Sequence, residues 1–292
     1  MDEEVRVPGN WGRWGEQDER GALNLVDEAA VRRGLTAVCR GRPVSLGLPV
    51  GPGAAPHASI RPDVQHLMFR DGGDYAAGLP ERPGYGFADD LLLLPCHGTT
   101  HIDALSHVWQ DGKMWNGIPA TEVTSRGARR AGVETMGPVV TRGILVDLAD
   151  ALNDGDAVTA DQLQTRLDEL GVEPMPGDAL LLRTGWLARW RADRAAIDTW
   201  PGYDASVAKL VDRYGLAVLG ADTISTEQNP SANPACALPV HVAVLRDRGV
   251  PLAELLDLEE LAQTGAVTFL LVISPLRILG GSGSPVAPTA II

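Results

Sequence analysis

Cysteine is scarce in this sequence, and its few positions are widely separated. The three cysteines, Cys39, Cys96 and Cys236, are odd in number and include no Cys-x-x-Cys pair. A disulfide framework needs paired cysteines and a thiolate zinc site needs closely spaced ones, so the sequence predicts neither. Such sparse cysteine usage fits a reducing compartment, and we expect a cytoplasmic protein.

Long apolar runs are missing as well. The longest, around residues 267–273, is too short to cross a bilayer as a helix and is soon followed by Pro275. The first residues, 1–6, are acidic and polar, whereas a secretory signal begins with basic residues and continues with apolar ones. We therefore expect no membrane segment, no secretory signal and no membrane partner.

Positive charge is in deficit. The chain has 25 lysines and arginines against 38 aspartates and glutamates, which gives a net charge of −13 and an isoelectric point near 4.8. Only the short segment 126–130 groups basic residues. An acidic surface repels phosphate backbones, so nucleic acid is excluded as a partner and a small-molecule substrate is expected.

The remaining composition is that of an ordinary folded protein. Hydrophobic residues make up 45% and charged residues 22% of the 292 positions, enough to bury a full core. Because neither a repeat nor a convincing linker interrupts the chain, we expect one domain over residues 1–292. Within it, residues 1–25 form an N-terminal arm, and the Gly-, Pro- and Asp-rich segment 51–90 is an insertion or a lid.

Helix and strand patterns alternate along the chain. Asp27 is expected to cap a helix through Val38, and residues 159–162 form a capping box before a helix that Gly171 closes. Short apolar runs of the buried-strand type occupy residues 143–148 and 178–183, and a third apolar run, residues 216–223, ends in polar groups. This mixture predicts an α/β fold, in which the third run brings Asp222 and Thr223 to the edge of a site.

Histidines are concentrated in one stretch. Of the six in the chain, His97, His101 and His107 fall within eleven positions, with Asp103 between them. All four numbers are odd, so an extended run would place these side chains on one face. Because Gly98 permits a local bend, we expect a strand end that turns into a loop, with the imidazoles and the carboxylate converging there. Imidazole nitrogens and a carboxylate suit Zn²⁺, Mn²⁺ or Fe²⁺, and such sites usually keep a position open for water. The stretch therefore predicts a catalytic metal site.

Two further residues stand out, each with an ordinary alternative. His241 lies in an apolar helix pattern and, taken alone, is expected to be a core histidine. Glu254 is surrounded by apolar residues, so its carboxylate needs a partner, and a cation is one way to supply it. His57 and His66 stand apart from other ligand types and are expected not to bind a metal.

Several tryptophans could line a binding pocket. Aromatic side chains near a site supply apolar contact for a ring-bearing substrate, although packing explains them equally well. The residues in question are Trp11, Trp14, Trp109 and Trp115.

The stretch 97–107 resembles the signature of the cyclase family of metal-dependent hydrolases, His-x-Gly-Thr-His-x-Asp-x-Pro-x-His, a family that includes bacterial kynurenine formamidase and isatin hydrolase. Thr99 replaces the glycine of that pattern and Leu105 replaces its proline, but all the ligands are present. The resemblance extends to residues 11–24 and 283–285. It implies a single α/β domain with a swivelling β/β/α architecture and a homodimer or larger homo-oligomer.

The same resemblance implies a role for each site residue. His97, His101 and Asp103 would bind a first divalent cation, and Asp103, His241 and Glu254 a second, with Glu254 shared. His107 would act as the acid/base. One or two ions are implied, with zinc as the expected metal and manganese as the alternative.

The function implied is metal-dependent hydrolysis, arylformamidase-like, of an amide, formamide or lactone bond in a small ring-bearing substrate. A biosynthetic cyclase or dehydratase, which is a lyase, would use the same cation to polarise a carbonyl without consuming water. A third alternative is a non-enzymatic metal- or ligand-binding protein. A closed metal cage would, however, need fewer proton-transfer groups than this motif carries.

Overall fold

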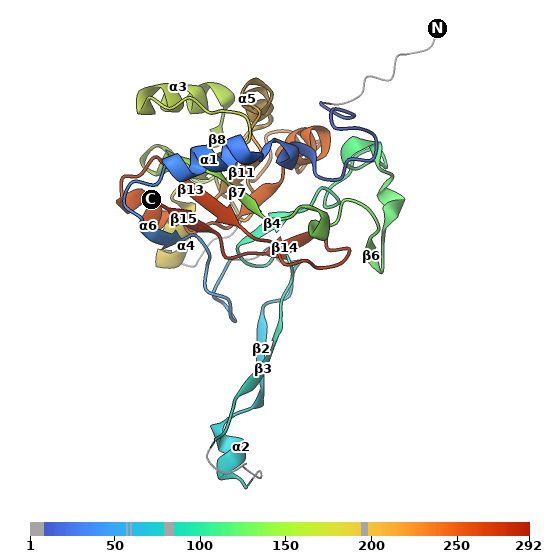
Figure 1. Ribbon diagram of the computed structural model, residues 1–292, viewed down its shortest axis with the longest axis vertical. Helices are drawn as coiled ribbons and strands as arrows, with labels where there is room; N and C mark the ends of the chain where they lie inside the picture. Colours follow the sequence, from blue (N-terminus) through green and yellow to red (C-terminus); the bar gives the residue numbers. More distant parts are fainter. Residues whose placement is uncertain (1–8, 57, 59, 79–84, 194–197) are drawn as a thin grey trace.

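A nine-stranded sheet forms the centre of the computed structural model, which describes residues 9–56, 58, 60–78, 85–193 and 198–292 (Figure 1). The strands, in spatial order, are β1 (Pro43–Ser45), β15 (Thr289–Ile291), β13 (Thr268–Ile273), β7 (Val139–Asp147), β9 (Ala179–Arg183), β11 (Val218–Ala221), β12 (Leu252–Glu254), β4 (His101–Asp103) and β14 (Gly283–Pro285). Strands β7, β9, β11 and β12 run parallel, and the outer pairs are antiparallel. The chain is thus mixed α/β with a curled sheet; the swivelling architecture stays a prediction.

The central strands are buried on both faces. Ile144 of β7 and Leu180 of β9 belong to one hydrophobic cluster, whereas their chain neighbours Leu145 and Leu181 belong to another. This alternation follows from the two-residue period of a strand, and burial on both faces explains the continuous apolar runs in the sequence. The three strands predicted from such runs are confirmed as β7, β9 and β11, although their ends differ by several residues, and the apolar run 267–273 contains β13.

Helices lie on the sheet. They are α1 (Glu28–Thr36), α3 (Ala160–Leu170), α4 (Trp186–Asp193), α5 (Ala208–Tyr214) and α6 (Glu259–Gln263), and Figure 1 shows α1, α3 and α5 on one side of the central strands. Both predicted caps are confirmed. The Asp27 carboxylate accepts a 2.9 Å hydrogen bond from the backbone N–H of Ala30, and Thr159 and Gln162 bond reciprocally. Gly171 ends α3 in the left-handed conformation, with φ of 63°.

Shorter elements complete the described chain. The 3₁₀ helices are η1 (Gly21–Leu25), η2 (Trp115–Gly117), η3 (Ala120–Glu122), η4 (Val133–Thr135), η5 (Ala149–Ala151) and η6 (Ala205–Val207), and η7 (His241–Arg246) is a π-helix. Two-residue strands pair as β5 (Val123–Thr124) with β6 (Gly127–Ala128) and as β8 (Ala157–Val158) with β10 (Gly202–Tyr203). Among the described residues, no helix combines the length and apolarity needed to cross a bilayer.

The segment 51–90, predicted to be an insertion or a lid, contains a long hairpin. Strands β2 (Gln65–Arg70) and β3 (Asp89–Leu93) pair antiparallel, and the short helix α2 (Gly72–Ala76) follows β2. Figure 1 shows the hairpin extending away from the body of the protein, with α2 far from β4. In this conformation the hairpin does not cover the histidine motif of residues 97–107. We call residues 65–78 and 85–93 the hairpin arm.

Candidate metal centre

Strands β4 and β12 place three of the predicted ligands side by side. In their antiparallel register Glu254 faces His101 directly. The His101 Nε2 atom lies 3.3 Å from Glu254 Oε2 and 3.5 Å from Asp103 Oδ1, and all three side chains are buried. Their spacing follows from the strand period, because positions 101 and 103 share one face of β4.

Turns, rather than an extended run, bring His97 and His107 to the same place. The backbone N–H of Gly98 donates to Pro95 O at 3.0 Å, and that of His107 donates to Ala104 O at 2.9 Å. The sequence predicted a strand end that turns into a loop, and β4 accordingly covers only three residues between these two turns. Close hydrogen bonds of the backbone at both ends redirect the chain.

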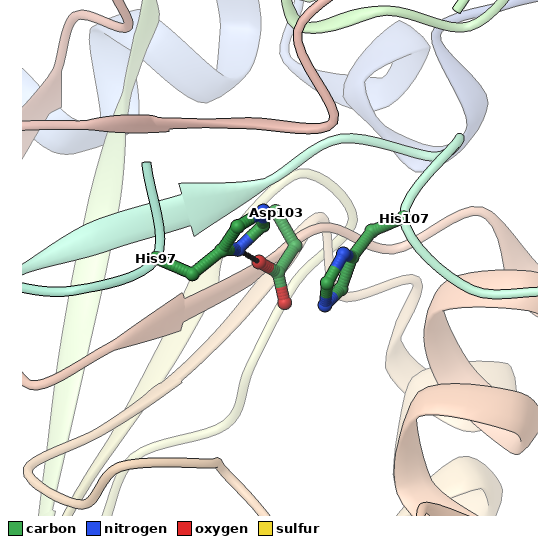
Figure 2. A group of neighbouring side chains, drawn as sticks. All are labelled: His97, Asp103 and His107. Atoms are coloured by element: carbon green, nitrogen blue, oxygen red, sulfur yellow. Dashed lines mark hydrogen bonds and ion pairs between the residues drawn. The ribbon is translucent and has the colours of Figure 1, made fainter. Parts of the chain in front are cut away.

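Both of these imidazoles nevertheless reach Asp103. Figure 2 shows the Asp103 carboxylate between His97 and His107, with His97 Nδ1 2.7 Å from Asp103 Oδ1. The two imidazole rings are stacked with centroids 4.1 Å apart. In two groups the possible ligand atoms all lie within 4.8 Å of one another; the groups are His97, Asp103 and His107, and His101, Asp103 and Glu254. Asp103 is common to both groups.

Gly283 gives the His97 ring its space. Strand β14 pairs with β4 so that Gly283 faces Asp103. A Cβ atom at position 283 would lie 2.5 Å from His97 Cε1, which is closer than non-bonded carbon atoms approach. The neighbouring Ser282 also contacts this ring, with its Oγ 3.1 Å from His97 Nε2. The glycine in the C-terminal part of the resemblance thus has a steric role at the site.

His241 joins the cluster from the π-helix η7. Its Nε2 atom lies 3.3 Å from Asp103 Oδ2 and 3.6 Å from Glu254 Oε1. π-Helical turns are rare and are frequently found at functional sites. The structure therefore brings together all six residues singled out from the sequence: His97, His101, Asp103, His107, His241 and Glu254. Their roles as ligands or acid/base stay predictions.

Glu227 is a residue of this cluster that the sequence analysis missed. Its carboxylate forms a hydrogen bond with His241 Nδ1 and accepts a 2.6 Å bond from the backbone N–H of Val240. A carboxylate on Nδ1 fixes the tautomer of an imidazole and leaves Nε2 free to bind a metal. The sequence offered no signal beyond an isolated glutamate after an apolar strand.

Replacing Glu227 with glutamine should weaken metal binding about 10- to 100-fold, because the neutral amide no longer holds the His241 ring in one tautomer. The dissociation constant can be measured by competition with a chromophoric chelator, without any substrate. Glu259→Gln is a matched control, since Glu259 pairs with Arg183 in a separate ion pair. Equal metal affinity in Glu227→Gln and the wild type would contradict this role.

The charges of the cluster need compensation. Three buried carboxylates, Asp103, Glu227 and Glu254, lie together, and in the described part of the chain no lysine or arginine forms an ion pair with any of them. Burial alone would lower the pKa of His241, but the Glu227 and Asp103 carboxylates outweigh it and raise this pKa well above its usual value. Burial alone would also lower the pKa of His101, but Glu254 and Asp103 outweigh it and raise this pKa above its usual value. The site attracts positive charge.

His107 differs from these two histidines. Its burial lowers its pKa to about 3, against the attraction of the Asp103 carboxylate and together with repulsion from the other imidazoles. Burial would raise the pKa of Asp103, but the neighbouring imidazoles of His107, His241 and His97 hold it well below the usual range. His107 is thus a neutral imidazole beside a carboxylate, with a nitrogen lone pair available for a proton or a cation.

The donor set fits a divalent cation. Two buried atoms at its centre, His101 Nε2 and Asp103 Oδ2, have no hydrogen-bond partner. Buried polar atoms without partners are uncommon and often mark a missing ion or water. The second nitrogen of His101, Nδ1, lies 2.7 Å from Thr99 O, so that Nε2 can carry the lone pair that a metal requires. Imidazole and carboxylate donors together suit zinc or manganese.

Asp222 and His66 lie away from the histidine cluster. The Asp222 carboxylate is buried and accepts hydrogen bonds from Thr184 and Gly185, so it connects β11 to the start of α4 instead of facing the histidines. His66 lies in the hairpin arm, 2.6 Å from Asp90, as expected of a non-ligand, and His57 lies outside the described residues. The prediction that strand β11 would deliver Asp222 to the site was wrong, because Thr184 and Gly185, in the turn between β9 and α4, donate hydrogen bonds to its carboxylate oxygens.

The four tryptophans considered as pocket residues differ in their burial. Trp115 is fully buried and packs 6.1 Å from Trp14, and the Trp11 Nε1–H donates to Arg246 O. These contacts anchor the N-terminal segment. Trp109, two residues after His107, is 49% exposed, which makes it the most exposed of the four and able to offer an aromatic face to a ligand.

Comparisons with known proteins agree with this geometry. The family model named Cyclase, described as "Putative cyclase", matches residues 44–228, a span that includes the histidine motif and Glu227. The chain belongs to the cyclase family. A solved structure described as a novel cyclase is 33% identical to this cyclase-family chain, covers 98% of both chains and superposes with a TM-score of 0.89.

Isatin hydrolases are also similar to this family member. One from Roseibium aggregatum is 26% identical over 70% of this chain and 75% of its own length. The structure of isatin hydrolase A from Ralstonia solanacearum, 25% identical, has a TM-score of 0.65 over 90% of this chain and 95% of the other. At the level of the cyclase family, these relatives support a metal-dependent hydrolase.

Proposed function

We propose that this protein hydrolyses an amide, formamide or lactone bond of a small ring-bearing substrate at a zinc centre made by the clustered residues. The observation that carries the proposal is the buried cluster around Asp103, in which four imidazoles and two further carboxylates converge without a lysine or arginine partner among the described residues. A site of this composition needs a cation more than it needs any other group.

The residues would divide the work between holding the cation and moving protons. His97, His101, Asp103, His241 and Glu254 would hold one or two ions, with Asp103 at the centre. A divalent cation supplies Lewis acidity, which polarises a carbonyl and makes water more acidic. Glu227 would orient His241, and the backbone N–H of Thr226, 2.8 Å from Glu254 Oε1, would orient the Glu254 carboxylate.

His107 would act as the acid/base. It is neutral, partly exposed and adjacent to Asp103, so it can take a proton from water and return it to the departing nitrogen or oxygen. Asp103 would stabilise the imidazolium formed in between, because the carboxylate favours the charged ring.

The substrate class follows from the relatives and from Trp109. A cyclic amide fused to an aromatic ring is the substrate type that isatin hydrolase names, and 26% identity over most of both chains makes it the first compound class to test. The half-exposed Trp109 would stack on such a ring, and aromatic pairs of this kind contribute about 0.5–1.5 kcal/mol beyond the area they bury.

The test is a substrate panel run on protein of known metal content. Isatin-type cyclic amides, N-aryl formamides and aromatic lactones would be incubated with enzyme loaded with Zn²⁺ or Mn²⁺ in H₂¹⁸O. Hydrolysis places ¹⁸O in the carboxylate product, which mass spectrometry detects.

Two results would contradict the proposal. Ring closure or dehydration without ¹⁸O uptake would favour the cyclase or dehydratase alternative at the same site. Full metal occupancy with no turnover of any compound would favour a metal-binding protein.

A further inference from the structure

Glu19 lies in the N-terminal segment that forms part of the family resemblance, and the proposed mechanism gives it no task. Its side chain is 27% exposed and accepts two hydrogen bonds. One comes from Arg130 Nε to Oε1 at 2.8 Å, and the other comes from the backbone N–H of Ala131 to Oε2 at 2.9 Å. Both carboxylate oxygens therefore hold the chain at residues 130 and 131.

Ala131 has a backbone conformation that needs such support. Its φ angle is 56°, in the left-handed region, where a residue with a Cβ atom is less stable by roughly 1–2 kcal/mol. Conformations of this kind persist only where the surrounding structure fixes them. The hydrogen bond to Glu19 is one such constraint, and the burial of Ala131, which is 1% exposed, is another.

Ala131 in turn contacts the turn that carries His107. The backbone N–H of Ser106 donates a 3.1 Å hydrogen bond to Ala131 O, and the next N–H, that of His107, donates to Ala104 O. Ser106 is fully buried, so its N–H would be left without a partner if the Ala131 peptide moved away. A movement of Ala131 is therefore transmitted to the residue directly before His107.

We propose that Glu19 is a positioning residue that acts on the acid/base through the backbone of Ala131. It holds the His107 ring where that ring stacks on His97, with centroids 4.1 Å apart, beside the Asp103 carboxylate (Figure 2). A displacement of about 1 Å caused by a distant residue can cost roughly 10²-fold in rate. The effect of Glu19 on turnover rests on the hydrolase function proposed above, whereas its effect on the His107 turn does not.

Glu19→Gln tests the proposal with little change of shape. The amide has a single oxygen, so it can no longer accept from both Arg130 and Ala131. We expect kcat to fall about 10- to 100-fold, with KM and metal content close to those of the wild type. Glu259→Gln breaks a comparably buried pair with Arg183 and should keep the wild-type kcat.

A double-mutant cycle with His107→Ala shows whether Glu19 acts through His107. If it does, Glu19→Gln should have almost no further effect on kcat in a protein that already lacks the imidazole, because the two residues act as a unit. An equal fold-loss of kcat in both backgrounds would mean that Glu19 supports the fold in general, and the proposal would be wrong.

Hydrogen exchange on metal-loaded protein tests the same coupling without any substrate. The backbone amides of Ser106 and His107 should exchange at least about tenfold faster in Glu19→Gln, while those of β7 keep their wild-type rates. Faster exchange throughout the molecule, or unchanged exchange at both amides, would overturn the proposal. If no compound is turned over, the proposed function fails, and this measurement still decides whether Glu19 holds the His107 turn.

Discussion

Asp103→Ala should lose its bound cation and fall in turnover by about 10³-fold or more. One Asp103 oxygen lies 2.7 Å from His97 Nδ1 and 3.5 Å from His101 Nε2, while the other lies 3.3 Å from His241 Nε2. Loss of a group that merely orients a metal ligand costs about 10- to 100-fold, so loss of the carboxylate shared by three imidazoles should cost more. Metal content after dialysis and turnover would be measured together.

Two variants make the Asp103 experiment specific. Asp103→Asn keeps the shape and removes the charge, and we expect nearly the same loss of metal. Asp222→Asn changes another fully buried aspartate, whose hydrogen bonds go to Thr184 and Gly185, and should lower thermal stability while retaining metal. If Asp103→Ala keeps its metal and turns over within tenfold of the wild type, Asp103 is not at the centre of the site.

His107→Ala should lower turnover by about 10²- to 10⁴-fold while the metal content stays unchanged. The alanine variant retains Asp103 and the other imidazoles but has no group beside them to carry a proton. His107 also lies within ligand distance of the His97 and Asp103 donor atoms, so the metal measurement decides between the two roles.

The His107→Ala experiment distinguishes an acid/base from a metal ligand. Lower turnover with full metal identifies an acid/base, whereas metal loss in parallel with turnover identifies a ligand. Turnover equal to that of the wild type would remove His107 from the mechanism. His66→Ala, which changes an exposed histidine of the hairpin arm, serves as the control for histidine loss in general.

The residues of the site were predictable because their chemistry is unusual in sequence. Three histidines and an aspartate within eleven positions stand out against any composition, and the family resemblance added His241 and Glu254. The path of the backbone was predictable only in outline. A strand end that turns into a loop was expected, but the two turns that limit β4 to three residues depend on hydrogen bonds to Pro95 and Ala104 that no periodicity records.

Elsewhere too, features that depend on neighbouring residues were predicted from the sequence, whereas contacts between distant residues were not. The Asp27 and Thr159 caps were predicted correctly because a cap involves only residues within one helical turn. Glu227 was missed because its partner His241 lies 14 residues away across a loop. Asp222 was misplaced because Thr184, 38 residues earlier, binds its carboxylate. A single sequence carries no record of such pairings.

The position of β4 in the sheet has a consequence for how the protein is made. His101 lies between Glu254 of β12 and Pro285 of β14, strands that the ribosome produces more than 150 residues later. An emerging chain that has only its N-terminal half therefore presents the histidine motif without the strands that shape it. The complete donor set includes Glu254, so it forms only once synthesis has passed that residue and β12 has paired with β4.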